Sequence, residues 1–417
     1  MLLVAALVVG QLATPSLEGP IFQASQVSPG FEFGSLSGSG MGAECACAAV
    51  TGSRGEVMTF ARVGNATCTK GTSGLRVTGI ANGDLVVCAG NQPRAMRDGD
   101  GVLGLFQESA ARTNSCLRSQ EIDNASWTKT GTGVAAPTVT ADFAVAPDGT
   151  TTAERVQIAA CPAAGNESMV SASYSASALA WAHTVYIKGN GGSGSVHLAV
   201  YNSSSGLSAA ANCAFVATSW SRCELLYAHT AAAAAVYYIG CKNSGTGAAN
   251  TGAADVLVWG AQVEAGDRAT SYIPTAAAGV TRNAESPPSF ATSWAAGTSA
   301  SVSMSIYTAY TPTTGTWFSA PLPSANPDLL GRLNLGTPGC YIRGPGELAA
   351  GSWATGANRW RCTTRRFVEL NGASNSGAAT TLFAGGTSIA FGNSAFAAAV
   401  DGIYSRVCFS PTEGGCR

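Results

Sequence analysis

Short runs of alternating apolar and polar residues follow one another along this chain, and each run stops at a cluster of Gly, Asn or Ser. Examples are HTVYIKG (183–189), SVHLAVYN (195–202), AVYYIGC (235–241) and DVLVWGAQVE (255–264). Apolar positions do not repeat with a 3.6-residue period over a dozen positions, so the pattern predicts strands rather than helices. Strands this short and regularly spaced are typical of β-sandwiches and jelly rolls. We therefore expect an all-β protein.

The alternation also predicts which side chains face outward. Along 183–189, Val185 and Ile187 are expected between two sheets, which leaves Tyr186 on the open face. By the same alternation His197 and Tyr201 point outward, and Tyr238 is a weaker candidate. Aromatic faces stack on sugars, and hydroxyls and amides hydrogen-bond to sugar oxygens, so these four residues are candidate ligand-binding residues. The competing interpretation is that they cover the outer sheet surface beneath a loop or a partner domain.

Three blocks divide the chain. Residues 1–113 form an irregular Gly-rich N-terminal region with weak periodicity, and 114–284 have the densest strand pattern. The two prolines of ESPPSF (285–290) mark a boundary, and 285–417 carry strands of their own. The sequence therefore predicts two consecutive sandwich modules after the N-terminal region.

The stretch VLVWGAQVEAGDRATSYIPT (256–275) ends the middle block. Val256 alternates with Leu257, so one set of side chains is expected between the sheets and the other against an adjacent surface. Trp259 is predicted to lie in a core rather than to serve as a sugar platform. Gly260 suggests a bulge or the close approach of another backbone. Pro274 lacks an amide hydrogen and ends the strand.

Charge excludes some partners. Lys and Arg number 23 against 24 Asp and Glu, so a net charge of −1 gives no electrostatic case for nucleic acid or an anionic membrane. Charged residues make up 11%, well below the roughly 25% of an average soluble domain. The resulting neutral, hydroxyl-rich surface is typical of extracellular β-proteins, although a GC-rich genome produces the same composition.

The N-terminus begins with an apolar run, MLLVAALVVGQLA (1–13), of the length of a signal-peptide core. It has no preceding Lys or Arg, so a cleaved signal and a first buried strand both remain open. No later stretch reaches about 18 consecutive apolar residues, and we expect no spanning helix.

Thirteen cysteines are more than an ordinary chain of this length contains, and Cys45 and Cys47 lack the second close pair of a zinc site. Disulfides are the better interpretation, and the odd count leaves one thiol over. Connectivity does not follow from sequence, so the pairs expected from proximity are hypotheses: Cys213–Cys223, Cys340–Cys362, Cys408–Cys416 and Cys68–Cys88.

Several segments in order resemble a known module. They are GLFQESAARTNSCLRSQEIDNASWTKTGTGV (104–134), APDGTTTAERV (146–156) and WGAQVEAGDRATSYIPT (259–275). Together they resemble a carbohydrate-binding jelly roll of bacteriophage tail and head-fibre proteins and of some secreted bacterial proteins, and MTFARVGNATC (58–68) extends the likeness upstream. In the third block, RRFVELNGASNSG (365–377) and AAAVDGIYSRVCFSPTEGGC (397–416) resemble concanavalin-like, laminin-G-type sandwiches.

The resemblance implies a non-catalytic glycan-binding or adhesion protein, secreted or on a virion surface. Its partner would be a glycan or cell-surface polysaccharide, with other virion or surface proteins and homo-oligomers as further partners. Such jelly rolls often hold a structural calcium between their first and last strands, where Glu121 and Glu264 lie in this sequence.

Two other functions stay open. A purely structural tail, fibre or capsid-decoration component would bind no sugar. A divergent glycoside hydrolase is the other alternative, because EIDNAS (121–126) resembles the E-x-D-x-x-E of a concanavalin-like hydrolase family. Ser126 stands where that family has its final carboxylate, and His183, His197 and His229 lack the spacing of metal ligands. We therefore expect no enzymatic activity.

Overall fold

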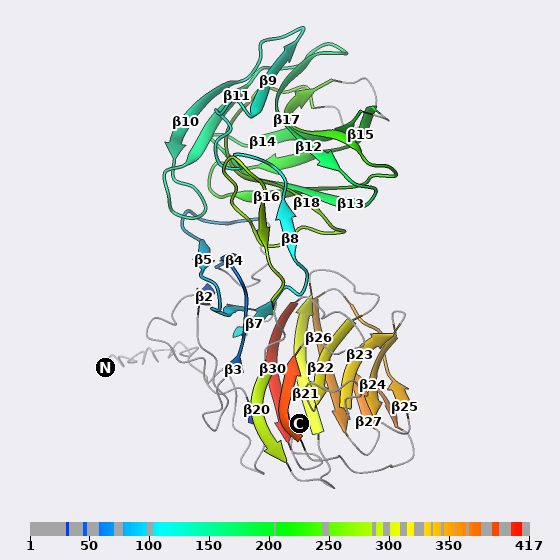
Figure 1. Ribbon diagram of the computed structural model, residues 1–417. Coiled ribbons are helices and arrows are strands. Elements are labelled where there is room, and N and C mark those ends of the chain that lie inside the picture. The colour runs from blue at the N-terminus through cyan, green and yellow to red at the C-terminus, as the bar shows by residue number, and fades with distance from the viewer. Residues whose placement is uncertain are drawn as a thin grey trace, which may run out of the picture.

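The computed structural model describes seventeen stretches of the chain, which contain the strands and loops between them (Figure 1). They are residues 31–32, 45–47, 58–70, 78–97, 103–203, 206–243, 250–285, 289–294, 301–308, 315–320, 329–334, 337–342, 346–354, 356–363, 367–376, 386–391 and 402–410. Every regular element in these stretches is a β-strand, which confirms the all-β prediction. The apolar run at 1–13 lies outside the described residues.

The middle of the chain forms a sandwich of two antiparallel five-stranded sheets, the central module (Figure 1). The β18 sheet has the order β10 (Thr138–Ala144), β11 (Ala153–Ile158), β18 (Ala254–Ala265), β13 (Ala180–Gly189) and β16 (Ser221–Ala228). The β14 sheet has the order β15 (Gly206–Phe215), β14 (Gly194–Asn202), β17 (Ala233–Lys242), β12 (Glu167–Ala176) and β9 (Trp127–Thr132). From β11 to β14 and from β15 to β18, each strand crosses to the other sheet, as in a jelly roll.

The core of the central module lies between these two sheets. Its members are the apolar residues that alternate along each strand, among them Val185, Ile187, Leu198, Val200, Val256, Val258 and Tyr237. Since successive side chains of a strand point to opposite faces, the same strands also carry an outward-facing set. The alternation of the sequence therefore predicted the direction of these side chains correctly.

The outward set of the β18 sheet is buried as well, in a second cluster that includes Trp259, Leu257 and Tyr186. The hairpin of β4 (Ala66–Thr69) and β5 (Leu85–Cys88) contributes to it, with Leu85 in the cluster. Backbone hydrogen bonds join Ile80 to Trp220 on this side. The prediction that Trp259 lies in a core is confirmed.

Gly260 is required where β18 passes this cluster. Its φ of 63° is a left-handed conformation, and a Cβ there would lie 3.0 Å from the Tyr186 ring and 3.3 Å from the Tyr272 ring. The pairing of β13 with β18 shifts register at this point, between Thr184 and Tyr186. Glycine thus allows both a bulge and close aromatic packing, as the sequence suggested.

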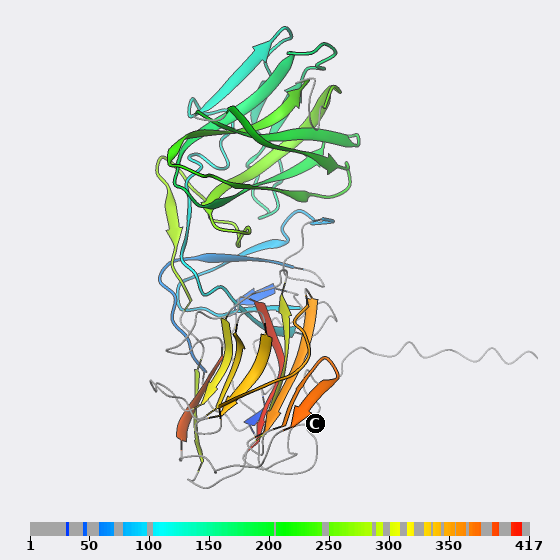
Figure 2. The same cartoon turned by 90° about the vertical axis from the view of Figure 1, so that its right-hand side faces the viewer.

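The second sandwich consists of a seven-stranded and a larger, nine-stranded sheet (Figure 2). The first has the order β25 (Gly346–Ala349), β24 (Thr337–Ile342), β23 (Leu329–Asn334), β22 (Gly315–Ala320), β29 (Gly386–Phe391), β20 (Ser289–Trp294) and β3 (Met58–Thr59). The second has the order β2 (Cys45–Cys47), β6 (Arg94–Arg97), β7 (Leu103–Gln107), β30 (Gly402–Ser410), β21 (Ser301–Thr308), β26 (Gly356–Thr363), β27 (Phe367–Leu370) and β28 (Ala373–Ser376), with β1 (Phe31–Glu32) also paired to β30.

Strand pairing runs across the three predicted blocks. β7 pairs with β30 and β3 pairs with β20, so strands from the N-terminal region complete both sheets of the second sandwich. The central module is inserted between β7 and β20. The chain enters it through β8 (Arg112–Asn114) and leaves it through β19 (Val280–Arg282), and these two strands pair as an antiparallel ribbon (Figure 1). The boundaries at 113 and 284 themselves stay predictions.

Three disulfides are described. Cys213–Cys223 and Cys340–Cys362 are confirmed, and the latter joins β24 to β26 across the two sheets of the second sandwich. The third, Cys161–Cys241, links residues 80 apart and was not predicted. Cys68 and Cys88 are disulfide-bonded, but their pairing with each other stays a prediction, and Cys416 lies outside the described residues. Cys116 is free among the described cysteines, and burial raises the pKa of its thiol to about 12.

A buried cluster of charges lies where the two sandwiches meet. Arg94 donates to Glu285 at 2.6 Å and contacts Glu108 at 2.8 Å, and Arg62 donates to Glu285 at 2.7 Å. Arg282 lies 3.4 Å from Glu108. Burial alone would raise the pKa of Glu108, but Arg282 and Arg94, helped by hydrogen bonds from Ser271, lower it to about 2. Glu108 is therefore ionised at neutral pH and holds the arginines in place.

Removing Arg94 tests this cluster. In Arg94→Met, Glu108 and Glu285 stay buried but lose the arginine that they share. Deleting one member of a buried ion pair lowers the free energy of unfolding by about 3–5 kcal/mol. The midpoint of the first transition in urea unfolding should fall accordingly. Arg268→Met, which removes the exposed pair with Asp267, is the control and should change stability by about 1 kcal/mol or less. Equal effects of the two substitutions would contradict a structural role for the cluster.

Candidate functional site

The outer face of the β14 sheet brings three of the four predicted ligand-binding residues together. Tyr201 and His197 lie four residues apart on β14, and Tyr238 lies on the adjacent β17. Tyr238 is paired with Ala199, the residue between the other two. Because their neighbours in sequence point into the core, all three side chains face outward.

Exposure separates these residues. Tyr201 is 43% exposed and offers a ring face to solvent, and Tyr238 is half-buried beside it. Burial raises the pKa of Tyr238, with Glu167 and Tyr201 adding to the effect. His197 is only 1% exposed although it faces outward, so it is covered and cannot contact a ligand in this conformation.

The prediction of an open position for Tyr186 is wrong. Tyr186 lies on the other sheet and is 1% exposed, because its ring packs edge-on against Trp259 and Tyr272. Thr67 of β4 donates to the Tyr272 carbonyl, which ties the hairpin to this cluster. At this position the competing interpretation is correct: Tyr186 covers the outer surface of its sheet and is itself covered by another part of the chain.

Small and hydroxyl-bearing residues continue the row of Tyr238 across the β14 sheet. Ser171 of β12 pairs with Tyr238, and Thr128 of β9 pairs with Ser171. Ser173 lies one row further along the sheet, in the row of Tyr201, and is exposed. The face therefore combines aromatic rings with hydroxyl groups, which can donate to and accept from sugar oxygens.

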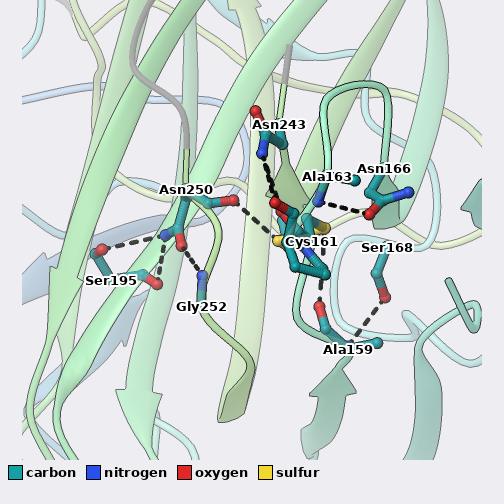
Figure 3. The surroundings of a disulfide bond; sticks show 11 residues. Ala159, Cys161, Ala163, Asn166, Ser168, Ser195, Asn243, Asn250 and Gly252 are labelled. Atoms are coloured by element: carbon teal, nitrogen blue, oxygen red, sulfur yellow. Dashed lines mark hydrogen bonds between the residues drawn. A yellow bond between two sulfur atoms is a disulfide. The ribbon is translucent and has the colours of Figure 1, made fainter. Parts of the chain in front are cut away.

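An ion pair and a disulfide fix one end of this face. Lys242 of β17 contacts Glu167 of the paired strand β12. Next to Lys242, Cys241 is bonded to Cys161 (Figure 3). Asn243 donates to the carbonyl of Cys161 at 3.2 Å, so the loop before β12 is held against the end of β17. The strands that carry Tyr238 and Ser171 are thereby locked in register.

Asn250 fastens the neighbouring strand at the same end (Figure 3). Its amide donates to the carbonyl of Ser195 at 2.6 Å and to the Ser195 hydroxyl, and its Oδ1 accepts from the amide of Gly252. Ser195 belongs to β14, the strand of Tyr201. The rigid end of the sheet thus positions both tyrosine-bearing strands.

The two residues predicted to bind calcium do not fit a shared ion. Glu264 is buried, and its oxygens accept from the Thr270 amide at 2.6 Å, the Thr270 hydroxyl at 2.7 Å and Gln262 at 2.8 Å. Glu121 instead pairs with Arg118 on the surface of a turn. The described residues contain no group of three or more His, Cys, Asp and Glu that could hold a metal ion.

The turn next to Glu121 encloses a cation that belongs to the chain itself. Lys129 Nζ donates to the carbonyls of Asp123, Asn124 and Trp127 at 2.8, 2.9 and 3.0 Å. Glu154 accepts from the amide of Asp123 at 2.6 Å, and burial raises its pKa to about 9 with the help of Asp123. An ammonium ion satisfies these carbonyls, so segment 121–127 is a structural cap on the sandwich.

The segments that carry the family resemblance form the seam that closes the module. Asn114 donates to the carbonyls of Ala261 and Ile273 at 3.1 and 2.8 Å and accepts from the amides of Cys116 and Val263. One side chain thus joins the start of the module to both its last strand and its exit.

A buried hydrogen-bond chain links the two sheets near Tyr201. Tyr174 Oη lies 2.7 Å from His183 Nε2 and 3.1 Å from His229 Nε2, while Asn202 Nδ2 donates to His229 Nδ1 at 2.8 Å. His183 Nδ1 donates to the carbonyl of Leu225, so its Nε2 accepts from Tyr174. His229 Nε2 then donates to Tyr174. All donors and acceptors of this chain match only when both histidines are neutral.

Histidine ionisation is correspondingly suppressed. Burial lowers the pKa of His183 to about 4, with the Leu225 hydrogen bond opposing and His229 adding to the shift. Burial also lowers the pKa of His229. These two histidines are structural, as expected from the sequence for each histidine alone.

Comparison with known proteins finds distant structural likeness. The chain matches no protein-family model and no curated protein. One similar structure is the N-terminal CBM22-1-CBM22-2 tandem of Xyn10C from Paenibacillus barcinonensis, with 11% identity and a TM-score of 0.29, covering 73% of this chain and 99% of that chain. Another is domains LG4-5 of the mouse laminin alpha1 chain, with 10% identity and a TM-score of 0.23, covering 67% and 92%.

Both structures are β-sandwich proteins, as this chain is. At TM-scores below 0.5 they carry no argument about its ligand. Neither is a bacteriophage protein, so the resemblance to the phage module stays a prediction. No helix among the described residues is long and apolar enough to cross a membrane.

The buried histidines predict a pH dependence of stability. The pKa of His183 is about 4 when folded against roughly 6.5 when unfolded. Its contribution is therefore complete above pH 6.5 and is lost as pH falls from 6.5 towards 4, on the order of 3 kcal/mol in full. The ionisation of Glu108, whose folded pKa is about 2, affects a lower pH range. Glu154, whose folded pKa is about 9, adds stability as pH falls through the same range, so the His183 contribution is measured as the difference between the wild type and a His183 variant in urea unfolding at pH 7.5, 6 and 4.5.

His183→Gln removes the titrating group while keeping a polar side chain. Its unfolding midpoint should be lower than that of the wild type at pH 7.5, and this difference should shrink as pH falls from 6.5 to 4.5, because Glu154 titrates alike in both proteins. Parallel pH profiles of the two proteins would show that His183 is not the group responsible.

Proposed function

We propose that the central module is a non-catalytic glycan-binding module and that the protein acts in adhesion. The observation that carries this proposal is the 43% exposed ring of Tyr201 on a sheet face shared with Tyr238. Exposed aromatic rings present a flat apolar surface to the C–H face of a sugar. A sheet face positions such rings more rigidly than a loop does.

The polar surroundings suit a neutral sugar. The exposed Ser173 and Thr128 supply hydroxyls near Tyr238, whereas Ser171, which pairs with Tyr238, is buried. Glu167 and Lys242 balance each other at one end. The chain as a whole has a net charge of −1, so long-range attraction to a charged polymer is not what brings a ligand to this face. Binding would rest on stacking and hydrogen bonds and would be weak at each site.

A hydrolytic function has less support. A glycosidase needs two carboxyl groups about 5–9.5 Å apart on either side of the bond that breaks. Glu154 has the raised pKa that a general acid requires, but it is 2% exposed and accepts from the backbone of Asp123. Glu121 is engaged with Arg118, and Ser126 stands in place of a third carboxylate.

The disulfides favour an oxidising compartment, so we place the protein outside the cell or on a virion surface. Cell-surface polysaccharide is then the proposed partner. Self-association, or assembly with other surface proteins, would raise the strength of attachment by multivalency. A purely structural fibre or capsid-decoration component remains the alternative function.

A glycan array tests the proposal. The intact protein should bind a defined subset of neutral oligosaccharides, and Tyr201→Ala and Tyr238→Ala should each weaken binding to that subset by about tenfold, equivalent to about 1.4 kcal/mol for a lost stacking contact. Leu226→Ala is the matched control, because Leu226 is also an exposed side chain but lies on the β18 sheet. It should leave binding unchanged.

Two outcomes would count against glycan binding at this face. An array without any retained glycan favours the structural alternative, which a stable trimer or larger complex in light scattering would support. Retention that Tyr201→Ala and Tyr238→Ala leave intact would move the site elsewhere.

A further inference from the structure

A second aromatic ring is exposed on the opposite side of the central module. Phe143 of β10 is 44% exposed, and it and Tyr201 are the only aromatic residues among the large exposed hydrophobic side chains of the described chain. The two rings lie on different sheets of one sandwich, Phe143 on the β18 sheet and Tyr201 on the β14 sheet. The hairpin of β4 and β5, which covers part of the β18 sheet, leaves Phe143 accessible.

The backbone at Phe143 departs from regular strand geometry. Thr140 pairs with Arg155 and Ala144 pairs with Ala153, so three residues of β10 lie opposite the single residue Glu154. Within this bulge Asp142 has a φ of 50°, which is uncommon for a residue other than glycine. Bulges re-aim side chains, and strained backbone of this kind is frequent at functional sites.

Arg155 forms a prearranged base for the ring. Its guanidinium carbon lies 5.2 Å from the centre of the Phe143 ring. Its Nε and Nη2 donate to the two carboxylate oxygens of Asp255 at 2.9 and 2.6 Å, and Asn190 donates to the same carboxylate at 3.2 Å. The bidentate contact fixes the plane of the guanidinium against which the ring lies. Little further conformational entropy of the ring is therefore lost on binding.

Hydroxyl and amide groups extend from this base along the sheet. Thr138 and Thr140 of β10 pair with Gln157 and Arg155 of β11, so the four side chains share the outer face. Thr138 donates to Gln157 at 3.2 Å, and both residues are exposed. A ring at one end and hydroxyl, amide and guanidinium groups beside it can contact both the apolar and the polar edges of a sugar ring.

The chemistry of this patch favours a neutral saccharide over a protein partner. Asp255 balances the charge of Arg155, and the exposed Asp142 of the bulge adds a negative charge, so the patch does not favour an anionic ligand. Protein interfaces are anchored by aromatic residues that are fully buried within an apolar centre. Here one ring and the neighbouring Val145 are exposed beside polar groups and do not lie within a buried apolar centre.

We infer that Phe143, Arg155 and the hydroxyls beside them form a second saccharide-binding site, which makes the central module bivalent. The class of ligand rests on the proposed function; the location does not. Because the two sites lie on opposite sheets, one module would connect two chains of a polysaccharide, or two positions on one surface, and gain strength from multivalency.

The test compares Phe143→Ala, Tyr201→Ala and the double substitution with the wild type on a glycan array of neutral oligosaccharides. Each single variant should keep part of the binding, weakened about tenfold or more on densely printed spots where bivalent contact is possible. The double variant should lose retention. Both residues are exposed, so the variants should fold, which their unfolding midpoints and near-ultraviolet circular dichroism would verify.

Arg155→Lys, made in the Tyr201→Ala background, examines the base of the second site. Lysine keeps the charge but cannot form the planar two-point contact with Asp255, so residual binding should weaken several-fold. Val145→Ala in the same background is the control, since Val145 is an exposed neighbour of Phe143 without its ring. It should leave residual binding unchanged.

The outcomes separate the second site from the proposed function. If Tyr201→Ala alone abolishes binding and Phe143→Ala has no effect, the second site is overturned and the function stands. If Phe143→Ala alone abolishes binding, the Tyr201 face is not a site and bivalency is overturned. If the wild type retains no glycan, both proposals fail.

Discussion

The structure depends on two carboxylates, Glu108 and Glu285, that are buried between three arginines. Glu108 follows β7 and Glu285 precedes β20, so they mark the points where the chain leaves and rejoins the second sandwich. The Glu108 amide also donates to Glu285 at 2.7 Å, and Ser271 at the exit of the central module donates to Glu108. Unpaired, these charges would be prohibitively costly to bury. The cluster therefore requires the N-terminal region, the central module and the second sandwich to be in place together.

This constraint decides which surfaces can bind a ligand. Arg62 and Arg94 flank the hairpin of β4 and β5, and anchoring them holds the hairpin against the β18 sheet. Tyr186 is buried as a result. The β14 sheet, on the other side of the sandwich, and the bulged edge at Phe143 stay accessible, with Tyr201 on the former. Closing the fold thus produces two exposed aromatic positions on opposite sheets of one module.

Local patterns in the sequence predicted local structure well. Alternation placed Val185 inward on its strand, Trp259 was predicted to lie in a core, and proximity predicted Cys213–Cys223. The sequence pattern could not reveal which outward face is covered, because that depends on pairing between strands far apart in the sequence, such as β7 with β30. Cys161–Cys241 was missed for the same reason. The contacts of Lys129 are local and were missed because strand alternation does not describe the turn that they close. The turn-like Ala-Asp-Phe in an otherwise alternating strand was the one sequence feature that could have predicted the exposed ring of Phe143.

The most direct measurement is hydroxyl-radical footprinting of the intact protein, with and without a glycan that it retains. The account predicts strong labelling of Tyr201 and Phe143 and weak labelling of Tyr186 and Tyr237 in the free protein, because the first two rings are exposed and the last two are buried. Glycan should reduce labelling of Tyr201. Strong labelling of Tyr186, or labelling of Tyr201 that a bound glycan leaves unchanged, would contradict it.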